Sequence, residues 1–124
     1  MQEIKLTKRQ EKSLARLREE FTKIKSEFEE IDFVLQGSVV ERWKKCGKPA
    51  CRCHKNPDEW HGPYHQWSWK SGGRTSSLSL SREQADLCRE WVENNRRLEG
   101  IVKKLRSLSS RAVRIYGIRK NRKK

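Results

Sequence analysis

The feature that most constrains this chain is a segment of twenty residues, 46–65, that is rich in cysteine and histidine. It contains three of the four cysteines and all three histidines of the chain. The spacing Cys46-x4-Cys51-x-Cys53 puts three thiols on one short loop, and Gly47 is suited to a positive φ in the turn between them. Thiolates and imidazoles gathered in this way are the usual ligands of tetrahedral zinc. We therefore predict a structural Zn2+ site that ties this loop together.

The fourth ligand must be a histidine or Cys88. We favour His61, because the Gly-Pro pair that follows it then turns the chain directly into the next strand. His65 falls on the apolar side of the predicted hairpin, His54 is too close to a cysteine ligand to bend easily onto the same ion, and Cys88 is interpreted as a small core residue. A Cys3His shell leaves no open position, so the ion would hold the fold and do no chemistry. Two alternatives remain, namely thiols that are merely buried and a disulfide or redox role.

The chain of 124 residues has little apolar material for a core, because 33% of its residues are hydrophobic and 37% are charged. A bound metal is a common way to stabilise a domain of this kind. No stretch approaches the roughly 18 apolar residues of a membrane span, and the N-terminus lacks the apolar segment of a secretory signal. We therefore expect a cytoplasmic protein that does not engage a membrane. In that reducing compartment clustered cysteines favour metal over disulfides.

Apolar residues near the N-terminus recur at alternating steps of three and four. This spacing is that of a heptad seam, and it predicts an amphipathic helix in residues 1–36 that runs from about residue 4 to residue 35 and ends at Gly37. Such a seam needs a partner. The partner is either the 14–35 helix of a second copy, another protein, or the C-terminal helix of the same chain. The seam consists of Leu14, Leu17, Phe21, Ile24, Phe28, Ile31 and Leu35.

Three strands are predicted between the helices. The second and third flank a Ser-Gly-Gly sequence, which is typical of a tight hairpin turn. A turn centred on the two glycines pairs Trp67 with Leu78 and His65 with Leu80, and this register makes one face of the hairpin apolar and the other polar. We interpret the tryptophans of the apolar face as core, and we expect Trp60 and Tyr64 to be exposed. The strands span residues 38–45, 64–70 and 74–80.

A capping box of Ser81 and Gln84 opens the last predicted helix. The sequence thus predicts an α+β fold, with a long N-terminal helix, a three-stranded antiparallel sheet that carries a zinc-knotted loop, and a long C-terminal helix with a basic tail. We expect one domain overall. Its parts are the helix at 1–36, the zinc-knotted sheet at 37–80, the helix at 81–110 and the basic tail at 111–124.

The net charge of +14 is concentrated at the C-terminal end of the chain. Residues 1–36 hold 8 basic and 8 acidic side chains, whereas residues 96–124 hold 12 basic side chains and 1 acidic one. This asymmetry indicates a polyanionic partner, and we predict a nucleic acid, with DNA favoured over RNA. A solubilising tail is the alternative, and an anionic membrane surface is a third option. The candidate phosphate-binding residues of this end are Lys103, Lys104, Arg106, Arg111, Arg114, Arg119, Lys120, Arg122, Lys123 and Lys124.

Further candidates lie in and around the predicted sheet. Its polar face carries donors and acceptors suited to phosphate contacts and some reading of base edges, although an ordinary solvated face has the same composition. We find no recognisable acid cluster, phosphate loop or oxyanion device, so we predict that the protein is not an enzyme. A helical scaffold subunit of a larger nucleoprotein complex is a second interpretation. The candidates of this region are Arg42, Lys44, Lys48, Arg52, Lys70 and Arg74.

The middle of the chain resembles an uncharacterised family of small bacterial and archaeal proteins with the signature CGKPxCxC…HGPY and no assigned activity. The resemblance covers about residues 37–95 and implies that Cys46, Cys51, Cys53 and His61 belong together as a unit. It also carries a loose association with mobile elements, which implies an accessory subunit of a mobile-element or recombination system. The residues that carry it are Gly37, Cys46-Gly47-Lys48-Pro49, Cys51-Arg52-Cys53, His61-Gly62-Pro63-Tyr64 and Gly73-Arg74-Thr75.

A second resemblance is architectural. A three-stranded sheet that ends in Gly-Gly-Arg-Thr and precedes a helix is similar to the arm-binding domains of phage-type integrases, which lay the sheet in the major groove of DNA. The inserted Cys/His loop departs from the pattern of those domains.

Overall fold

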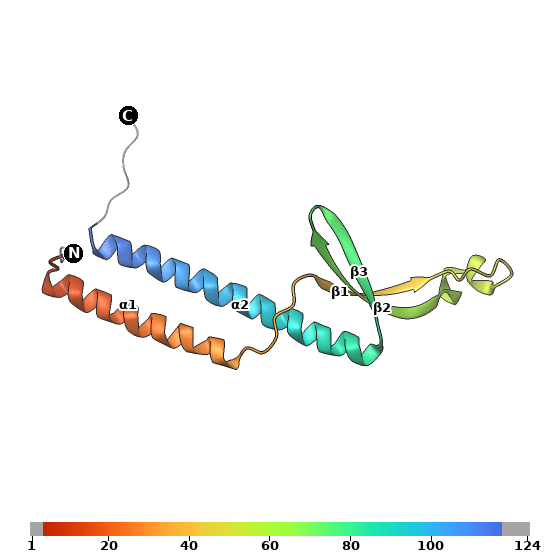
Figure 1. The fold of residues 1–124 in the computed structure, drawn as a ribbon, viewed down its shortest axis with the longest axis horizontal. Helices are drawn as coiled ribbons and strands as arrows, with labels where there is room; N and C mark the ends of the chain where they lie inside the picture. Colours follow the sequence, from red (N-terminus) through yellow and green to blue (C-terminus); the bar gives the residue numbers. More distant parts are fainter. Residues whose placement is uncertain (1–3, 118–124) are drawn as a thin grey trace, which may run out of the picture. The chain divides into compact units, whose positions relative to one another are not determined.

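The computed structural model describes residues 4–117, and their elements follow the predicted order of helix, sheet and helix (Figure 1). The fold class is α+β, as predicted. The chain divides into a helical unit (Met1–Asp32 and Arg96–Lys124) and a sheet unit (Phe33–Asn95), and the last helix contributes to both. The elements are α1 (Lys8–Ser26), a 3-10 turn (Glu27–Glu30), β1 (Ser38–Lys44), β2 (His61–Ser71), β3 (Arg74–Leu80) and α2 (Arg82–Ile115).

Helix α1 begins at a capping box and ends nine residues earlier than the sequence pattern predicts. Thr7 is the N-cap, and its hydroxyl accepts the N–H of Gln10 at 3.1 Å. At the other end the Ser26 hydroxyl donates to the Lys23 carbonyl at 2.6 Å, and three glutamates follow at the negative end of the helix dipole. The prediction of one helix to residue 35 that ends at Gly37 is therefore wrong, because these acidic residues disfavour its continuation.

The segment after α1 is held by α2 within the sheet unit. The Leu35 N–H donates to the Trp91 carbonyl at 3.0 Å, and the Asn94 side-chain amide donates to the Phe33 carbonyl at 3.0 Å. The Phe33 ring also meets the Trp91 ring edge-on, with centroids 5.0 Å apart. These contacts use backbone groups that a continued helix would occupy, so they are a second reason why the helix stops.

In the helical unit α1 runs antiparallel to the C-terminal half of α2 (Figure 1). Leu17 of α1 and Ile101 and Leu108 of α2 are buried, and burial of each such side chain contributes roughly 1.5–3 kcal/mol. Ion pairs flank the apolar contact, with Glu30–Arg97 at 3.5 Å and Glu20–Arg111 at 3.8 Å. At Leu17 the seam therefore packs within its own chain, which is one of the partners that the heptad pattern left open, while its other residues are half-buried.

The sheet is an antiparallel meander with the order β1-β2-β3. Trp67 pairs with Leu78 and His65 with Leu80, which is the predicted register. The turn between β2 and β3 is formed by the Gly-Gly pair, whose φ angles are +57° and +79°. Two consecutive positive φ values define the type I′ turn of two-residue hairpins, which suits glycine best. The alternation of apolar and polar residues and the turn chemistry agree, and together they fix the register.

The two faces of the sheet differ in chemistry. The apolar face contains Trp67 and Trp69, whose rings stack with centroids 3.9 Å apart, and the Trp67 indole N–H donates to the Gln36 carbonyl at 2.7 Å. Both tryptophans are half-buried, so the prediction that they are core residues is wrong, because this face is only partly covered and Leu78 on it is 54% exposed. We call the opposite side the polar face. Seven of its ten residues are solvent-exposed. From the pairing register its residues are Ser38, Val40, Arg42, Tyr64, Gln66, Ser68, Lys70, Thr75, Ser77 and Ser79.

Helix α2 begins at the predicted capping box, in which the Ser81 hydroxyl accepts the Gln84 N–H at 3.1 Å. It continues to Ile115, into the segment predicted as the basic tail. The predicted basic tail therefore starts as helix, and its residues 118–124 lie outside the described residues. Among the residues that the structure describes, no helix combines the length and the apolar character needed to cross a membrane.

Candidate functional site

The cysteine-rich loop leaves the sheet at the end of β1 and folds into two short turns. The Cys51 N–H donates to the Lys48 carbonyl at 3.1 Å and closes a turn around Pro49 and Ala50. Proline fixes φ near −65°, which suits the second position of such a turn. A 3-10 turn, Arg52–His54, follows directly and carries Cys53. The second and third cysteines are thus positioned by two consecutive tight turns.

The loop returns to the sheet through another capped turn. Asn56 accepts the Asp58 N–H on its side-chain oxygen at 3.1 Å and opens the 3-10 turn Pro57–Glu59. His61 then begins β2 and pairs with Lys44 at the end of β1. Because the ladder fixes these two ends of the loop, it also fixes the approach of the histidine to the cysteines.

Glycine is required at the start of β2, and it is not the glycine that the sequence indicated. Gly62 has φ +151°, and a Cβ on it would lie 2.8 Å from the Arg42 carbonyl oxygen and 3.1 Å from the Trp43 ring. The positive φ expected for Gly47 is not present, so that prediction is wrong. A proline-centred turn reverses the chain after Gly47 without it, whereas the close approach of β1 and β2 leaves no room for a side chain at Gly62.

The structure brings together the four residues predicted to bind the metal. The ligand atoms of Cys46, Cys51, Cys53 and His61 all lie within 4.8 Å of one another. The Cys46 and Cys53 sulfurs are 3.6 Å apart, and the Cys51 sulfur is 3.3 Å from His61 Nε2. With Zn–S near 2.3 Å and Zn–N near 2.0 Å, a tetrahedral ion needs about 3.8 Å between two sulfurs and about 3.5 Å between sulfur and nitrogen. The donor set therefore fits one tetrahedral metal ion.

The thiols differ in their electrostatic environment. The pKa of Cys51 is lowered to about 6, first by the backbone N–H of Cys53 and then by the His61 side chain. Burial raises the pKa of Cys53, which has no exposed surface, and the Cys46 N–H that donates to its sulfur at 3.3 Å opposes this effect. A backbone N–H directed at a sulfur stabilises the thiolate, which is the form that binds metals. All four cysteines of the chain are free thiols.

The other three candidates for the fourth ligand lie outside the cluster. His54 Nε2 donates to the Cys46 carbonyl at 2.8 Å, so this ring braces the loop instead of facing the ligand atoms. His65 is buried on the apolar face of the sheet, with 8% of its surface exposed, as predicted. Cys88 is half-buried on α2. His61 is therefore the histidine that completes the set.

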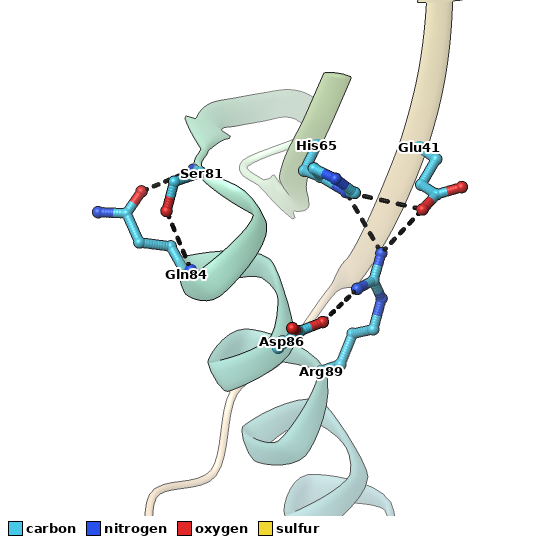
Figure 2. A network of polar contacts seen from close by, with 6 residues as sticks. All are labelled: Glu41, His65, Ser81, Gln84, Asp86 and Arg89. Atoms are coloured by element: carbon cyan, nitrogen blue, oxygen red, sulfur yellow. Dashed lines mark hydrogen bonds and ion pairs between the residues drawn. The ribbon is translucent and has the colours of Figure 1, made fainter. Parts of the chain in front are cut away.

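A polar network around His65 ties the first turns of α2 to the sheet (Figure 2). Arg89 Nη2 donates to His65 Nδ1 at 3.4 Å and lies 3.7 Å from Glu41 Oε1, while its Nη1 donates to Asp86 at 3.1 Å. His65 Nδ1 is 3.9 Å from the same Glu41 oxygen. This network was not predicted from the sequence, although the cross-strand pairing of Glu41 with His65 follows from the register of β1 on β2.

The predicted nucleic-acid contacts of the sheet unit are exposed but do not all share one surface. Arg42 and Lys70 lie on the polar face. Lys44 is close to it, with its Nζ 5.8 Å from the centroid of the Tyr64 ring. Tyr64 is 47% exposed, as expected. Trp60 was also expected to be exposed, but it is half-buried, and its indole N–H has no hydrogen-bond partner. The remaining candidates of this unit are in the metal loop (Lys48, Arg52) and at the start of β3 (Arg74).

The predicted contacts on α2 belong to the helical unit, and each is solvent-exposed. The basic residues of α1, among them Arg16, were not predicted as candidates, because residues 1–36 have no net charge when they are counted together. The available signal was that most basic residues of this segment come before most of its acidic residues. The candidate nucleic-acid-binding residues that the structure describes on α2 are Lys103, Lys104, Arg106, Arg111 and Arg114. The candidates Arg119, Lys120, Arg122, Lys123 and Lys124 fall outside the described residues.

The fold and the donor set define a small α+β protein with a candidate Cys3His metal site. The family described as "Domain of unknown function (DUF6788)" matches residues 4–90, and the chain belongs to this family. The match includes α1 as well as the metal loop, so it extends further toward the N-terminus than the resemblance found over residues 37–95. No curated protein and no solved structure matches the chain significantly.

Proposed function

We propose that this protein is a zinc-stabilised nucleic-acid-binding protein with a preference for duplex DNA. The observation that carries the proposal is the polar face of the sheet. This surface is exposed, contains Arg42 and Lys70 but no acidic residue, and is rich in hydroxyl and amide groups. Such a set of cations, donors and acceptors suits contact with a phosphate backbone and with base edges.

Zinc is the metal that suits the Cys3His cluster best. Three thiolates and one imidazole form a soft, four-coordinate shell, which is typical of structural zinc. The filled shell has a formal charge of −1, and Lys48 and Arg52 lie on the same loop as cations that offset it. In this proposal the ion performs no reaction. It fixes the loop between β1 and β2, and thereby holds the two strands that contribute Arg42, Tyr64 and Lys70 to the polar face.

The preference for DNA follows from the shape of the surface. A small antiparallel sheet can enter the major groove of a B-form duplex, whereas the corresponding groove of an RNA helix is too narrow for side chains to read. We place the protein as an accessory subunit of a mobile-element or recombination system, and this part of the proposal is supported by the stated resemblance alone.

Single-stranded nucleic acid, including RNA, is the second candidate ligand, and Tyr64 favours it. An exposed aromatic ring beside Lys44 and across the strand pair from Arg42 has the chemistry of a base-stacking platform. The scaffold interpretation has less support, because Leu17 at the centre of the α1 seam is buried within the same chain, although the other seam residues are only half-buried. A measured mass of the zinc-loaded protein in solution tests the scaffold interpretation, which requires a dimer or a larger assembly.

Competition between ligands tests the proposal. Zinc-loaded full-length protein is bound to a labelled DNA duplex, and unlabelled duplex DNA, single-stranded DNA and structured RNA compete at one fixed salt concentration. We expect duplex DNA to compete best and the double variant Arg42→Gln/Lys70→Gln to bind more weakly. Lys55→Gln/Arg82→Gln, which removes the same charge from two exposed residues of the same unit outside the polar face, is the control for general charge effects. The proposal would be contradicted if Arg42→Gln/Lys70→Gln bound duplex DNA as tightly as wild type, or if wild type bound none of the three ligands.

A further inference from the structure

The antiparallel pairing of α1 and α2 places basic residues of both helices at the same end, although residues 1–36 have no net charge as a whole. Residues 4–18 contain 6 basic side chains and 1 acidic one, whereas residues 19–32 contain 2 basic and 6 acidic ones. Residues 100–117 of α2 contain 5 basic side chains and no acidic one. The ion pairs Glu30–Arg97 and Glu20–Arg111 join the two helices in antiparallel order, so the first half of α1 lies beside the end of α2. One end of the described helix pair is therefore strongly basic.

An open groove between the two helices lies at this basic end. Its volume is about 320 Å³, and three arginines line it: Arg16 from α1, and Arg111 and Arg114 from α2. Glu20, whose carboxylate is 3.8 Å from Arg111 Nη1, also lines the groove. Because Glu20 is the one carboxylate in this lining and pairs with Arg111, the groove has a net charge of two positive units from Arg16 and Arg114. All three arginines are solvent-exposed. We call this site the arginine groove.

Guanidinium groups that converge on one groove suit phosphate chemistry. Each presents a planar fork of N–H donors that matches two phosphate oxygens, and it keeps its charge at every physiological pH. The Ser13 hydroxyl, on the same face of α1, adds one more donor to the lining. The groove is open to solvent along the helix pair, so it suits a group on an extended chain better than an enclosed small molecule.

The length of the basic surface points to a nucleic acid as the source of the phosphates. Residues 103–114 of α2 span about 16 Å at roughly 1.5 Å per residue. A duplex carries one negative charge per about 1.7 Å of its axis, so the same length of duplex presents about nine charges. Exposed basic side chains at Lys103, Lys104 and Arg106 extend the cationic surface from the groove along α2. A regular polyanion therefore matches this surface along its length.

We infer that the arginine groove is a second nucleic-acid contact, which binds backbone phosphates and does not read the base sequence. This inference rests on the proposed function and adds a site to it, in the other unit of the chain. It assigns Arg16 a binding role that the charge of the N-terminal segment as a whole conceals. The polar face of the sheet contributes the contacts to base edges. The groove contributes electrostatic affinity for phosphates, which decreases as the salt concentration rises.

The salt dependence of DNA binding tests the inference. The variant is Arg16→Gln/Arg114→Gln, because Arg111 already pairs with Glu20 and its loss would perturb the helix pair. The matched control is Lys23→Gln/Lys25→Gln, which removes the same charge from the acidic end of α1. Affinity for two short DNA duplexes of unrelated sequence is measured by fluorescence anisotropy over a series of salt concentrations, with zinc-loaded full-length protein.

The plot of log affinity against log salt has a negative slope. We expect the groove variant to make this slope less steep by about 1.8, since each lost phosphate contact removes about 0.9 from its magnitude. The loss of affinity should be equal for the two duplexes, and the control should keep the wild-type slope. An unchanged slope in the groove variant overturns the inference. So does an equal fall in the control, which would show an effect of net charge, or a loss confined to one sequence.

Failure of the proposed function gives a different pattern. If wild-type protein binds no duplex, single strand or RNA, the proposed function fails and the groove assignment fails with it. If wild type binds and only Arg42→Gln/Lys70→Gln weakens binding, the proposed function stands and the groove assignment fails. Circular dichroism melts check that each variant is folded. If the double groove variant melts below wild type, the single variants R16Q and R114Q replace it, and each should lower the slope by about 0.9.

Discussion

The sheet unit and the helical unit are stabilised in different ways. In the helical unit, apolar side chains such as Leu17, Ile101 and Leu108 are buried between two helices. In the metal loop of the sheet unit the fully buried side chain is Cys53, which is itself a candidate ligand. The loop is built from short turns, and the ligand atoms of its four candidate residues lie within 4.8 Å of one another. The comparison sets a region held by burial beside a loop whose four candidate ligands are gathered as a metal site requires.

Removal of the metal should separate the two units most clearly. A strong zinc chelator, or the substitution Cys53→Ser, should unfold the loop, because coordination supplies the folding free energy of such sites. The near-ultraviolet circular dichroism of the tryptophans should collapse, while the helical far-ultraviolet signal is largely retained.

Cys88→Ser is the matched control, since Cys88 is outside the cluster, and it should leave both signals and the metal content unchanged. A cooperative melt that is the same with and without metal would show that the loop is held by something other than coordination.

The converse substitution should affect the helical unit alone. Leu17→Ala leaves a cavity between α1 and α2 and should lower the free energy of unfolding of that unit by about 2–5 kcal/mol. The metal content, measured by elemental analysis, should stay at the wild-type value. Val113→Ala, at a position on α2 that is 44% exposed, should cost less than about 0.5 kcal/mol. Loss of metal in the Leu17 variant would mean that the two units are not independent.

A smaller effect is expected at the start of β2, where backbone geometry couples the sheet to the loop. Gly62→Ala places a Cβ 2.8 Å from the Arg42 carbonyl oxygen at a positive φ, and should destabilise the sheet unit by about 1–3 kcal/mol. Gly47→Ala meets nothing within 4 Å and should be close to neutral. Denaturant titration of both variants checks this difference, and equal effects would refute the assignment of the close approach to Gly62.

The surface ion pairs should matter least. Glu30 and Arg97 are 3.5 Å apart with side chains 72% and 46% exposed, so solvent screens their attraction. A double-mutant cycle with Glu30→Gln and Arg97→Gln should give a coupling free energy of about 0–1 kcal/mol that decreases with salt. A coupling above about 2 kcal/mol would imply that this pair, and not the apolar seam, sets the register of the helices.

The sequence predicts the sheet and the metal ligands better than it predicts the helical unit. The hairpin register follows from strict alternation and a Gly-Gly turn, and the ligand set follows from the spacing of three cysteines and one histidine that precedes a strand. These signals are local. Little in them depends on parts of the chain that are distant in the sequence.

The end of α1 and the sorting of charge depend on distant residues. The heptad spacing continues through Ile31 and Leu35, yet α2 holds the Leu35 N–H through the Trp91 carbonyl. In the same way, Arg16 gains two arginine neighbours only when α2 packs against α1. The pattern of a single segment cannot show contacts that another segment creates, and this is why both features were missed.

X-ray absorption at the zinc edge of the purified protein tests the central claim most directly. The account predicts one zinc per chain with three sulfur neighbours at about 2.3 Å and one nitrogen neighbour at about 2.0 Å. The variant His61→Ala should replace the nitrogen with a solvent oxygen or lose the ion. A folded protein without bound metal, or an ion surrounded only by oxygen and nitrogen, would contradict the account.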